Sequence, residues 1–221
     1  DGTIRLPRRE SEFYRDVMTG TYNRRYYEEK VRHEKITGGV AMIDLDNFKL
    51  YNDIYGHDAG DAVLKAATAR MRFSIRKTDK LIRYGGDEFL LVIPGIPDNI
   101  FVKTLQNICD NVNSLQIKGY DGIHVSVSIG GVMCRGEATE DAVSRADSLM
   151  YRAKSRKNTV VTEKDHDDSP SEADKPLSLL AHRDKEVQEA LIRSMRAQSS
   201  VIVAESSEEC ISTLEKYGSA L

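Results

Sequence analysis

Hydrophobic and polar positions follow two rhythms along the chain. Apolar residues recur at helical spacing in stretches such as "DAVLKAATARMRFSIRK", and amphipathic helices are predicted at 61–77, 98–115 and 139–157. Short runs rich in Val, Ile and Leu stand between them and predict strands at 40–45, 123–134 and 158–163, with a hairpin over 79–95. A polar helix is expected from Tyr22 to about Lys35, ended by Gly38-Gly39.

Helices thus alternate with strands around one sheet that contains a central hairpin. This order predicts an α/β (α+β) sandwich of the ferredoxin-like kind rather than a doubly wound sheet. From Glu163 the composition changes to "EKDHDDSPSEADKP", which is typical of a linker. Beyond it a strand, a helix, a strand and a helix are predicted, which is half a fold. The expected organisation is an N-terminal linker or helix at 1–15, the main domain at 16–162, a linker at 163–176 and a C-terminal α/β extension at 177–221.

The charge of the chain is nearly balanced, with 32 basic and 35 acidic residues and a formal net charge of -3. No overall basic field attracts nucleic acid or an anionic membrane, so an anionic ligand must be met locally. The three cysteines are widely spaced and form no zinc motif, which favours a reducing, cytoplasmic compartment. No apolar run approaches the ~20 residues that span a bilayer. Because the chain begins without Met, we expect a fragment, the cytoplasmic part of a larger sensor, with no membrane contact of its own.

Two groups of acids are predicted to meet at neighbouring strand ends. Asp44 lies at the end of the run "VAMIDL", and the hairpin turn supplies Asp87 and Glu88. Carboxylates brought close together repel one another unless a cation lies between them, and Mg²⁺ is commonly held by one or two carboxylates together with substrate phosphates. Gly85 and Gly86 lack a Cβ, so a phosphate or a base could lie against the backbone. Taken alone, the string G-G-D-E is more simply a tight turn with solvated acids, but the second acidic strand end favours a metal-phosphate site.

The set of spaced motifs resembles the GGDEF-type diguanylate cyclases. "RYGGDEF", with "DLDNFKLYNDIYGHDAGD" before it and "SVSIGG" and "ADSLMYRAK" after it, matches this family in order over residues 16–161. The resemblance implies a bacterial signalling enzyme that joins two GTP molecules into cyclic di-GMP and releases two pyrophosphates. It also implies a palm-like fold shared with nucleotide cyclases and polymerases, and a head-to-head homodimer, because each site holds one GTP.

The resemblance carries roles over to particular residues. The implied metal ligands for Mg²⁺ or Mn²⁺ are Asp44, Asp87 and the carbonyl of Leu45. Residues implied in substrate binding are Asn52 and Asp61, which would read guanine, with Phe48, Gly85 and Gly86. Residues implied in catalysis are Asp87, Glu88, Lys49 and Lys154, of which the lysines would contact phosphates. Without the motif, helix capping would explain Asn52 and Asp61 more simply, and the lysines would be ordinary surface residues.

A second motif, "RKTD", matches the inhibitory RxxD site of the family, with Arg76 and Asp79 as its ends. The resemblance implies that cyclic di-GMP binds there as product and inhibitor, although a bare four-residue pattern is often a helix-end ion pair. After Lys154 the chain has "SRKN" where the family often has a longer, glycine-containing segment. Whether Arg156 or Lys157 takes over a phosphate contact is therefore left open.

The C-terminal extension weakly resembles the first half of a response-regulator receiver domain. His182 and Arg183 stand where a receiver would place its metal-binding acids. An unrelated interaction extension is an equally good interpretation. For the whole chain, the alternative to an enzyme is a catalytically silent module that binds GTP or cyclic di-GMP, and a pure scaffold is the third.

Overall fold

The structure is a computed structural model that describes residues 12–120, 122–167, 177–181, 200–204, 206 and 211. The chain divides after Asp165 into two compact units, residues 1–165 and 166–221. Within the described residues, no helix is long and apolar enough to cross a bilayer.

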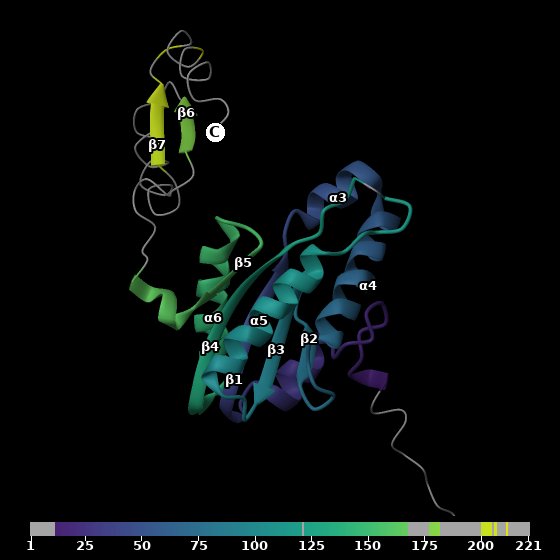
Figure 1. Ribbon diagram of the computed structural model, residues 1–221, viewed down its shortest axis with the longest axis vertical. Helices are drawn as coiled ribbons and strands as arrows, with labels where there is room; N and C mark the ends of the chain where they lie inside the picture. Colours follow the sequence, from purple (N-terminus) through teal and green to yellow (C-terminus); the bar gives the residue numbers. More distant parts are fainter. Residues whose placement is uncertain are drawn as a thin grey trace, which may run out of the picture. The chain divides into compact units, whose positions relative to one another are not determined.

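The first unit is built on a five-stranded sheet in the order β2-β3-β1-β4-β5 (Figure 1). The strands are β1 (Lys35–Leu45), β2 (Lys80–Arg83), β3 (Glu88–Pro94), β4 (Val127–Ala138) and β5 (Thr159–Thr162). Neighbouring strands are antiparallel, except that β4 and β5 run parallel. The mixed sheet with its helices confirms the predicted α/β sandwich, but the β2–β3 hairpin lies at one edge of the sheet and not at its centre.

Helices cover both faces of this sheet (Figure 1). The elements that pack with Ala41 and Ile43 of β1 are α3 (Phe48–Tyr55), α4 (His57–Phe73) and α5 (Asp98–Asn113). The elements that pack with Val40 and Met42 are the π-helical turn η1 (Tyr27–Val31), which follows the short α2 (Arg24–Tyr26), and α6 (Thr139–Lys154). Because side chains alternate along a strand, β1 contributes to two separate cores.

The polar helix expected over 22–35 is shorter than predicted. Helical structure ends at Val31, and β1 begins at Lys35, so Gly38 and Gly39 lie inside the strand and do not end a helix. Tertiary packing explains the glycine at position 39, because a Cβ on Gly39 would stand 2.3 Å from the ring of Phe101. The glycine therefore gives α5 room to pack on the sheet.

Two further boundaries differ from the prediction. Helix α4 begins at His57 and not at 61, and α3, which the hydrophobic pattern did not predict, fills the stretch before it. Strand β4 begins at Val127 and not at 123. Ile123 and Val125 are nevertheless buried, at 3% and 0% exposed, so the alternating burial of apolar residues begins before the residues that pair in the sheet.

The second unit contains a two-stranded parallel sheet. Its strands are β6 (Leu177–Ala181) and β7 (Ser200–Ala204), which pair from Leu177 opposite Ser200 to Ala181 opposite Ala204. Both strands were predicted from the sequence. The helices predicted at 183–198 and 206–218, and residues His182 and Arg183, lie outside the described residues apart from Ser206 and Ile211.

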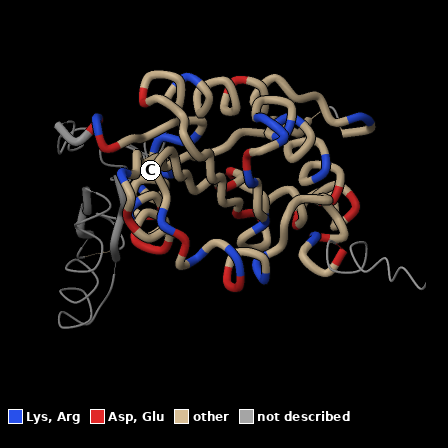
Figure 2. Tube along the Cα trace, turned by 90° about the horizontal axis from the view of Figure 1, so that it is seen from below, with Lys and Arg blue, Asp and Glu red and all other residues tan. Residues whose placement is uncertain are grey.

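Charges of both signs are distributed around the described residues (Figure 2). Lys and Arg are interspersed with Asp and Glu along the trace, and several of them form exposed pairs such as Arg25 with Glu29. Such surface pairs contribute little to stability. The electrostatics that matter are therefore those of buried acids.

Candidate active site

The acidic residues meet where β1 and β3 end. These strands are antiparallel neighbours, and Asp44 stands directly opposite Glu88 in their register. The backbone N–H of Leu45 donates to the carbonyl of Asp87 at 3.2 Å, which attaches the acidic turn to the end of β1. The expectation that the two groups of acids come from adjacent strand ends is confirmed.

Asp44 is a buried carboxylate, 5% exposed, with a single cation beside it. The ammonium of Lys154, at the end of α6, lies 2.9 Å from its Oδ2. Burial, together with the negative charges of Asp87 and Glu88, raises the pKa of Asp44 to about 6 against the opposing effect of Lys154. Burial also lowers the pKa of Lys154, but its bond to Asp44 outweighs burial, so that pKa is raised. The site thus holds more negative charge than one lysine neutralises.

This donor set suits a hard divalent cation. Carboxylates and a backbone carbonyl are oxygen ligands, and Mg²⁺ is usually bound by one or two carboxylates plus water and phosphate. Among the described residues, no three His, Cys, Asp or Glu side chains gather as a complete metal site. Asp44 and Asp87 would therefore need substrate oxygens to complete the coordination of a cation.

The two glycines of the turn differ in their surroundings. The N–H groups of Tyr84 and Gly85 both donate to the carbonyl of Glu88, at 2.8 and 3.2 Å, which closes the turn. A Cβ on Gly85 would stand 2.5 Å from Oε2 of Glu88, whereas one on Gly86 would meet no atom within 4 Å. Only the space beside Gly86 is thus open to a ligand, because the Glu88 side chain occupies the other.

Arg83 and Asp16 support this turn, and sequence reasoning assigned neither of them a role. The Arg83 guanidinium donates twice to the carbonyl of Gly86, from Nη2 at 2.7 Å and Nε at 3.1 Å. Its Nη1 donates to both carboxylate oxygens of Asp16, at 3.2 and 3.3 Å. Burial raises the pKa of Asp16, but bonds from Thr19 and the charge of Arg83 lower it below its ordinary value. The sequence signal that could have indicated a role for Arg83 is its position two residues before Gly85.

Asp46, two residues after Asp44, has a structural role. Its carboxylate accepts hydrogen bonds from Ser126 Oγ at 2.6 Å, Ser128 Oγ at 2.7 Å and the backbone N–H of Asn158 at 2.9 Å. These bonds join the end of β1 to β4 and to the turn before β5. The two buried acids therefore differ, since Asp46 is satisfied by neutral donors and Asp44 by one ammonium.

The helices α3 and α4 present the residues implied in guanine binding. Asn52 lies on α3, and a Cβ on Gly60 would stand 2.0 Å from its Oδ1, so its carboxamide packs against the residue that precedes Asp61. Helix α4 has Gly56 at its N-cap with no side-chain bond, and Asp61 lies inside the helix. The capping interpretation is therefore wrong for both residues. Phe48 is half-buried and Lys49 exposed, both in the first turn of α3.

The "SRKN" turn packs on the loop after β1. Lys157 and Asn158 have φ values of 53° and 44°, which are left-handed conformations uncommon outside glycine. Lys157 Nζ donates to Oδ1 of Asn47 at 3.0 Å. Both candidate cations in this turn, Arg156 and Lys157, are exposed. Through its bond to Asn47, Lys157 reaches the loop after the acidic strand end.

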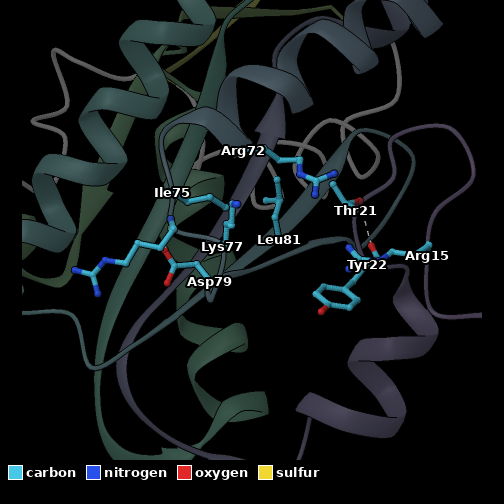
Figure 3. Close-up of a pocket in the computed structure, with 9 residues that line it drawn as sticks. Arg15, Thr21, Tyr22, Arg72, Ile75, Lys77, Asp79 and Leu81 are labelled. Atoms are coloured by element: carbon cyan, nitrogen blue, oxygen red, sulfur yellow. Dashed lines mark hydrogen bonds between the residues drawn. The ribbon is translucent and has the colours of Figure 1, made fainter. Parts of the chain in front are cut away.

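A basic pocket adjoins the RxxD segment (Figure 3). Asp79 accepts a bond from the backbone N–H of Arg76 at 2.7 Å, so within this turn its carboxylate bonds backbone rather than the Arg76 guanidinium. Arg15 and Arg72 both donate to the carbonyl of Gly20, at 3.2 and 3.3 Å. The pocket, of about 130 Å³, is lined by Arg15, Thr21, Tyr22, Arg72, Ile75, Arg76, Lys77, Asp79 and Leu81.

A ferredoxin-like sheet with an acidic glycine turn beside a buried aspartate defines the class of this domain. The family "Diguanylate cyclase, GGDEF domain" matches residues 13–159, and the chain belongs to this family.

Related proteins support the same classification. Diguanylate cyclase DosC of Escherichia coli is 34% identical over 151 residues, 64% of this chain and 33% of that protein. The crystal structure of diguanylate cyclase SiaD with its activator SiaC, from Pseudomonas aeruginosa, is 32% identical with a TM-score of 0.63, over 70% of this chain and 64% of that one. A microbial GGDEF domain described in interaction with cyclic di-GMP is 28% identical with a TM-score of 0.55, over 68% of this chain and 99% of that one. The chain spans about a third to a half of the length of curated relatives such as DosC and DgcS of Shewanella oneidensis.

Proposed function

We propose that the protein is a diguanylate cyclase, which condenses two GTP molecules into cyclic di-GMP and releases two pyrophosphates. Each 3′-hydroxyl would attack the α-phosphorus of the other GTP, with pyrophosphate as the leaving group. The observation that carries this proposal is the meeting of Asp44 with the acidic turn, where burial and repulsion raise the pKa of Asp44 to about 6. A site with that much unneutralised negative charge is suited to a divalent cation, which would in turn bind the phosphates of a nucleoside triphosphate.

The proposed roles follow the position of each side chain. Asp44, Asp87 and the Leu45 carbonyl would hold Mg²⁺ or Mn²⁺, which when bound supplies charge stabilisation for the pentavalent α-phosphorus and the leaving pyrophosphate. Lys154 and Lys49 would contact phosphates, as compact charges suited to that task.

The substrate would be recognised by the α3–α4 pair and the turn. Asn52 and Asp61 would read the guanine edge, because an amide and a carboxylate together match its acceptor and donors. Phe48 would lie beside the guanine base, and the open space beside Gly86 would admit the phosphates of the nucleotide. Glu88, which lies over Gly85, is the remaining acid of the site, and we assign it to catalysis without specifying which proton it handles.

The direct test is incubation of concentrated protein with GTP and Mg²⁺, with products identified by chromatography and mass. Asp87→Ala is expected to make no cyclic di-GMP. The matched control is Asp141→Ala, which removes an exposed acid on α6 and is expected to retain the activity of the parent chain. If the parent chain makes no product at any protein concentration but binds GTP or cyclic di-GMP, the silent receptor is the better interpretation.

Product inhibition is proposed for the pocket beside Arg76 and Asp79. Its lining carries four cationic residues and one acid, which suits an anionic ligand in a protein of net negative charge. Arg76→Ala is expected to raise the concentration of cyclic di-GMP that halves the activity. An unchanged inhibition curve would remove this assignment.

Three further assignments are proposed for the chain as a whole. The enzyme would work as a head-to-head homodimer, because each site offers one set of guanine-binding residues while the reaction joins two nucleotides. It would act in the cytoplasm, as part of a larger signalling protein. The second unit, with its parallel strands β6 and β7, would be a receiver-like segment.

A further inference from the structure

We propose that Tyr84 is a positioning residue, whose ring is held by Tyr27 and Arg24 and thereby fixes the location of the acidic turn. The inference rests on the function proposed above, because it concerns the same site. It adds a link between this turn and the N-terminal segment, defined here as residues 13–31.

Backbone hydrogen bonds hold the acidic turn on two sides, in addition to the bonds from the Arg83 guanidinium to the carbonyl of Gly86. Leu45 N–H donates to the Asp87 carbonyl at 3.2 Å on the β1 side. On the other side, the N–H groups of Tyr84 and Gly85 donate to the carbonyl of Glu88. Any displacement of Tyr84 is therefore passed directly to Glu88 and to its neighbour Asp87.

The side chain of Tyr84 points away from the turn into the N-terminal segment. Its ring meets the ring of Tyr27 edge to face, with centroids 5.2 Å apart and planes at 71°. The Arg24 guanidinium lies over the same ring, with Cζ 4.8 Å from the centroid. Tyr27 is only 3% exposed and belongs to the core beneath α6. Tyr84 thus connects a polar turn to a buried anchor.

The N-terminal segment, which carries Tyr27, is itself held against the sheet. Tyr22 N–H donates to the carbonyl of Leu81 at 3.0 Å, and Arg83 N–H donates to the carbonyl of Tyr22 at 2.7 Å, so the N-terminal segment pairs with the outer edge of β2. The rings of Tyr22 and Tyr26 stack with centroids 3.8 Å apart. The π-helical turn that begins at Tyr27 is a rare geometry that is frequent at functional sites.

Loss of the ring contacts would lower the fraction of molecules in which the acids stand correctly. An aromatic pair and an exposed cation–π contact together correspond to roughly tenfold in an equilibrium constant. The apparent affinity for a cation falls in proportion to the competent fraction. A turn that has lost these ring contacts should therefore bind a divalent cation several-fold more weakly, while the fold of the sheet remains.

The test measures Mn²⁺ binding by the electron paramagnetic resonance signal of the free ion, alongside cyclic di-GMP synthesis from GTP. Tyr84→Leu removes the ring, and Tyr84→Phe keeps both ring contacts and removes only the hydroxyl. Tyr14→Leu is the matched control, because it removes edge-to-face pairs with Phe13 and Tyr26 and a hydrogen bond to Glu29, all inside the N-terminal segment, and removes no ring contact to the turn. Far-UV circular dichroism and the unfolding midpoint confirm that each variant is folded.

We expect Tyr84→Leu to raise the Mn²⁺ dissociation constant several-fold, with about tenfold as the upper limit, and to lower kcat by a similar factor, with Tyr84→Phe and Tyr14→Leu within about twofold of the parent chain. Equal Mn²⁺ affinity in Tyr84→Leu and the parent chain would overturn the inference, as would a Tyr84→Phe variant as weak as Tyr84→Leu. A parent chain that binds no Mn²⁺ also overturns it. A parent chain that makes no cyclic di-GMP, but whose Mn²⁺ affinity falls in Tyr84→Leu, contradicts the proposed function and leaves the positioning role supported.

Discussion

Replacing Asp44 by Asn should stabilise the metal-free protein at neutral pH while removing its proposed function. Burial raises the pKa of this carboxyl from 3.8 to about 6 in the folded state. A rise of roughly two units corresponds to about 3 kcal/mol, because each unit is worth about 1.4 kcal/mol. Since Lys154 loses its partner in the variant, we expect a net gain of about 1–3 kcal/mol at pH 8.

The sign of this effect follows from proton linkage. A raised pKa means that the folded state binds the proton more tightly than the unfolded state does. The favourable contribution of Asp44 is therefore complete below pH 3.8 and is lost as the pH rises to about 6. Asn does not titrate, so the stability difference between the variant and the parent chain should be close to zero at pH 4 and reach its full value above pH 7.

The assay is urea unfolding followed by far-UV circular dichroism at pH 4, 6 and 8, with a chelator present. Asp46→Asn is the matched control, since Asp46 is equally buried, at 4% against 5% exposed, but accepts three hydrogen bonds from neutral donors. That control should lose about 1–3 kcal/mol at pH 8, the opposite sign. A less stable Asp44→Asn variant at pH 8, or a difference independent of pH, would refute the reasoning.

Four other predictions concern the support of the acidic turn, the packing of the sheet and the domain boundary. Arg83→Met should cost about 1–3 kcal/mol of stability in urea unfolding and lower cyclic di-GMP synthesis, because the Gly86 carbonyl loses its two guanidinium donors and Asp16 keeps only its bonds from Thr19. Unchanged values for both would contradict this role. Gly130→Ala should lower the free energy of unfolding by about 3 kcal/mol or more, because its Cβ would stand 2.1 Å from backbone atoms of α6. Gly39→Ala should lose less in the same unfolding assay, because the nearest atoms to its Cβ belong to the side chain of the buried Phe101, which can shift more readily than backbone. Limited proteolysis followed by mass mapping should cut within 163–176, and cleavage inside 139–161 would contradict the proposed boundary.

Local pattern was informative for elements whose burial is periodic. The hairpin over 79–95 and the helices near 98–113 and 139–154 could be predicted because a strand or helix that packs on one core repeats its apolar positions at a fixed interval. It failed for α3, a short helix whose apolar residues include Leu50 and Ile54, which are 51% and 62% exposed. It also failed at Gly38-Gly39, where Gly39 gives room to Phe101 of α5 and Gly38 to the backbone around Ile93 and Pro94 of the neighbouring strand.

For the site, the sequence by itself determined the chemical groups: an acid at the end of β1, a glycine turn with two acids, and motifs that identify a GGDEF domain. Their arrangement depended on contacts between residues far apart in the chain. Only the tertiary structure decided that Lys154 lies on Asp44, that Asp46 is a structural acid, and that Arg83 and Tyr84 attach the turn to the N-terminal segment. The physical reason is that burial and long-range neighbours set the charge and position of a side chain, and neither is encoded in local spacing.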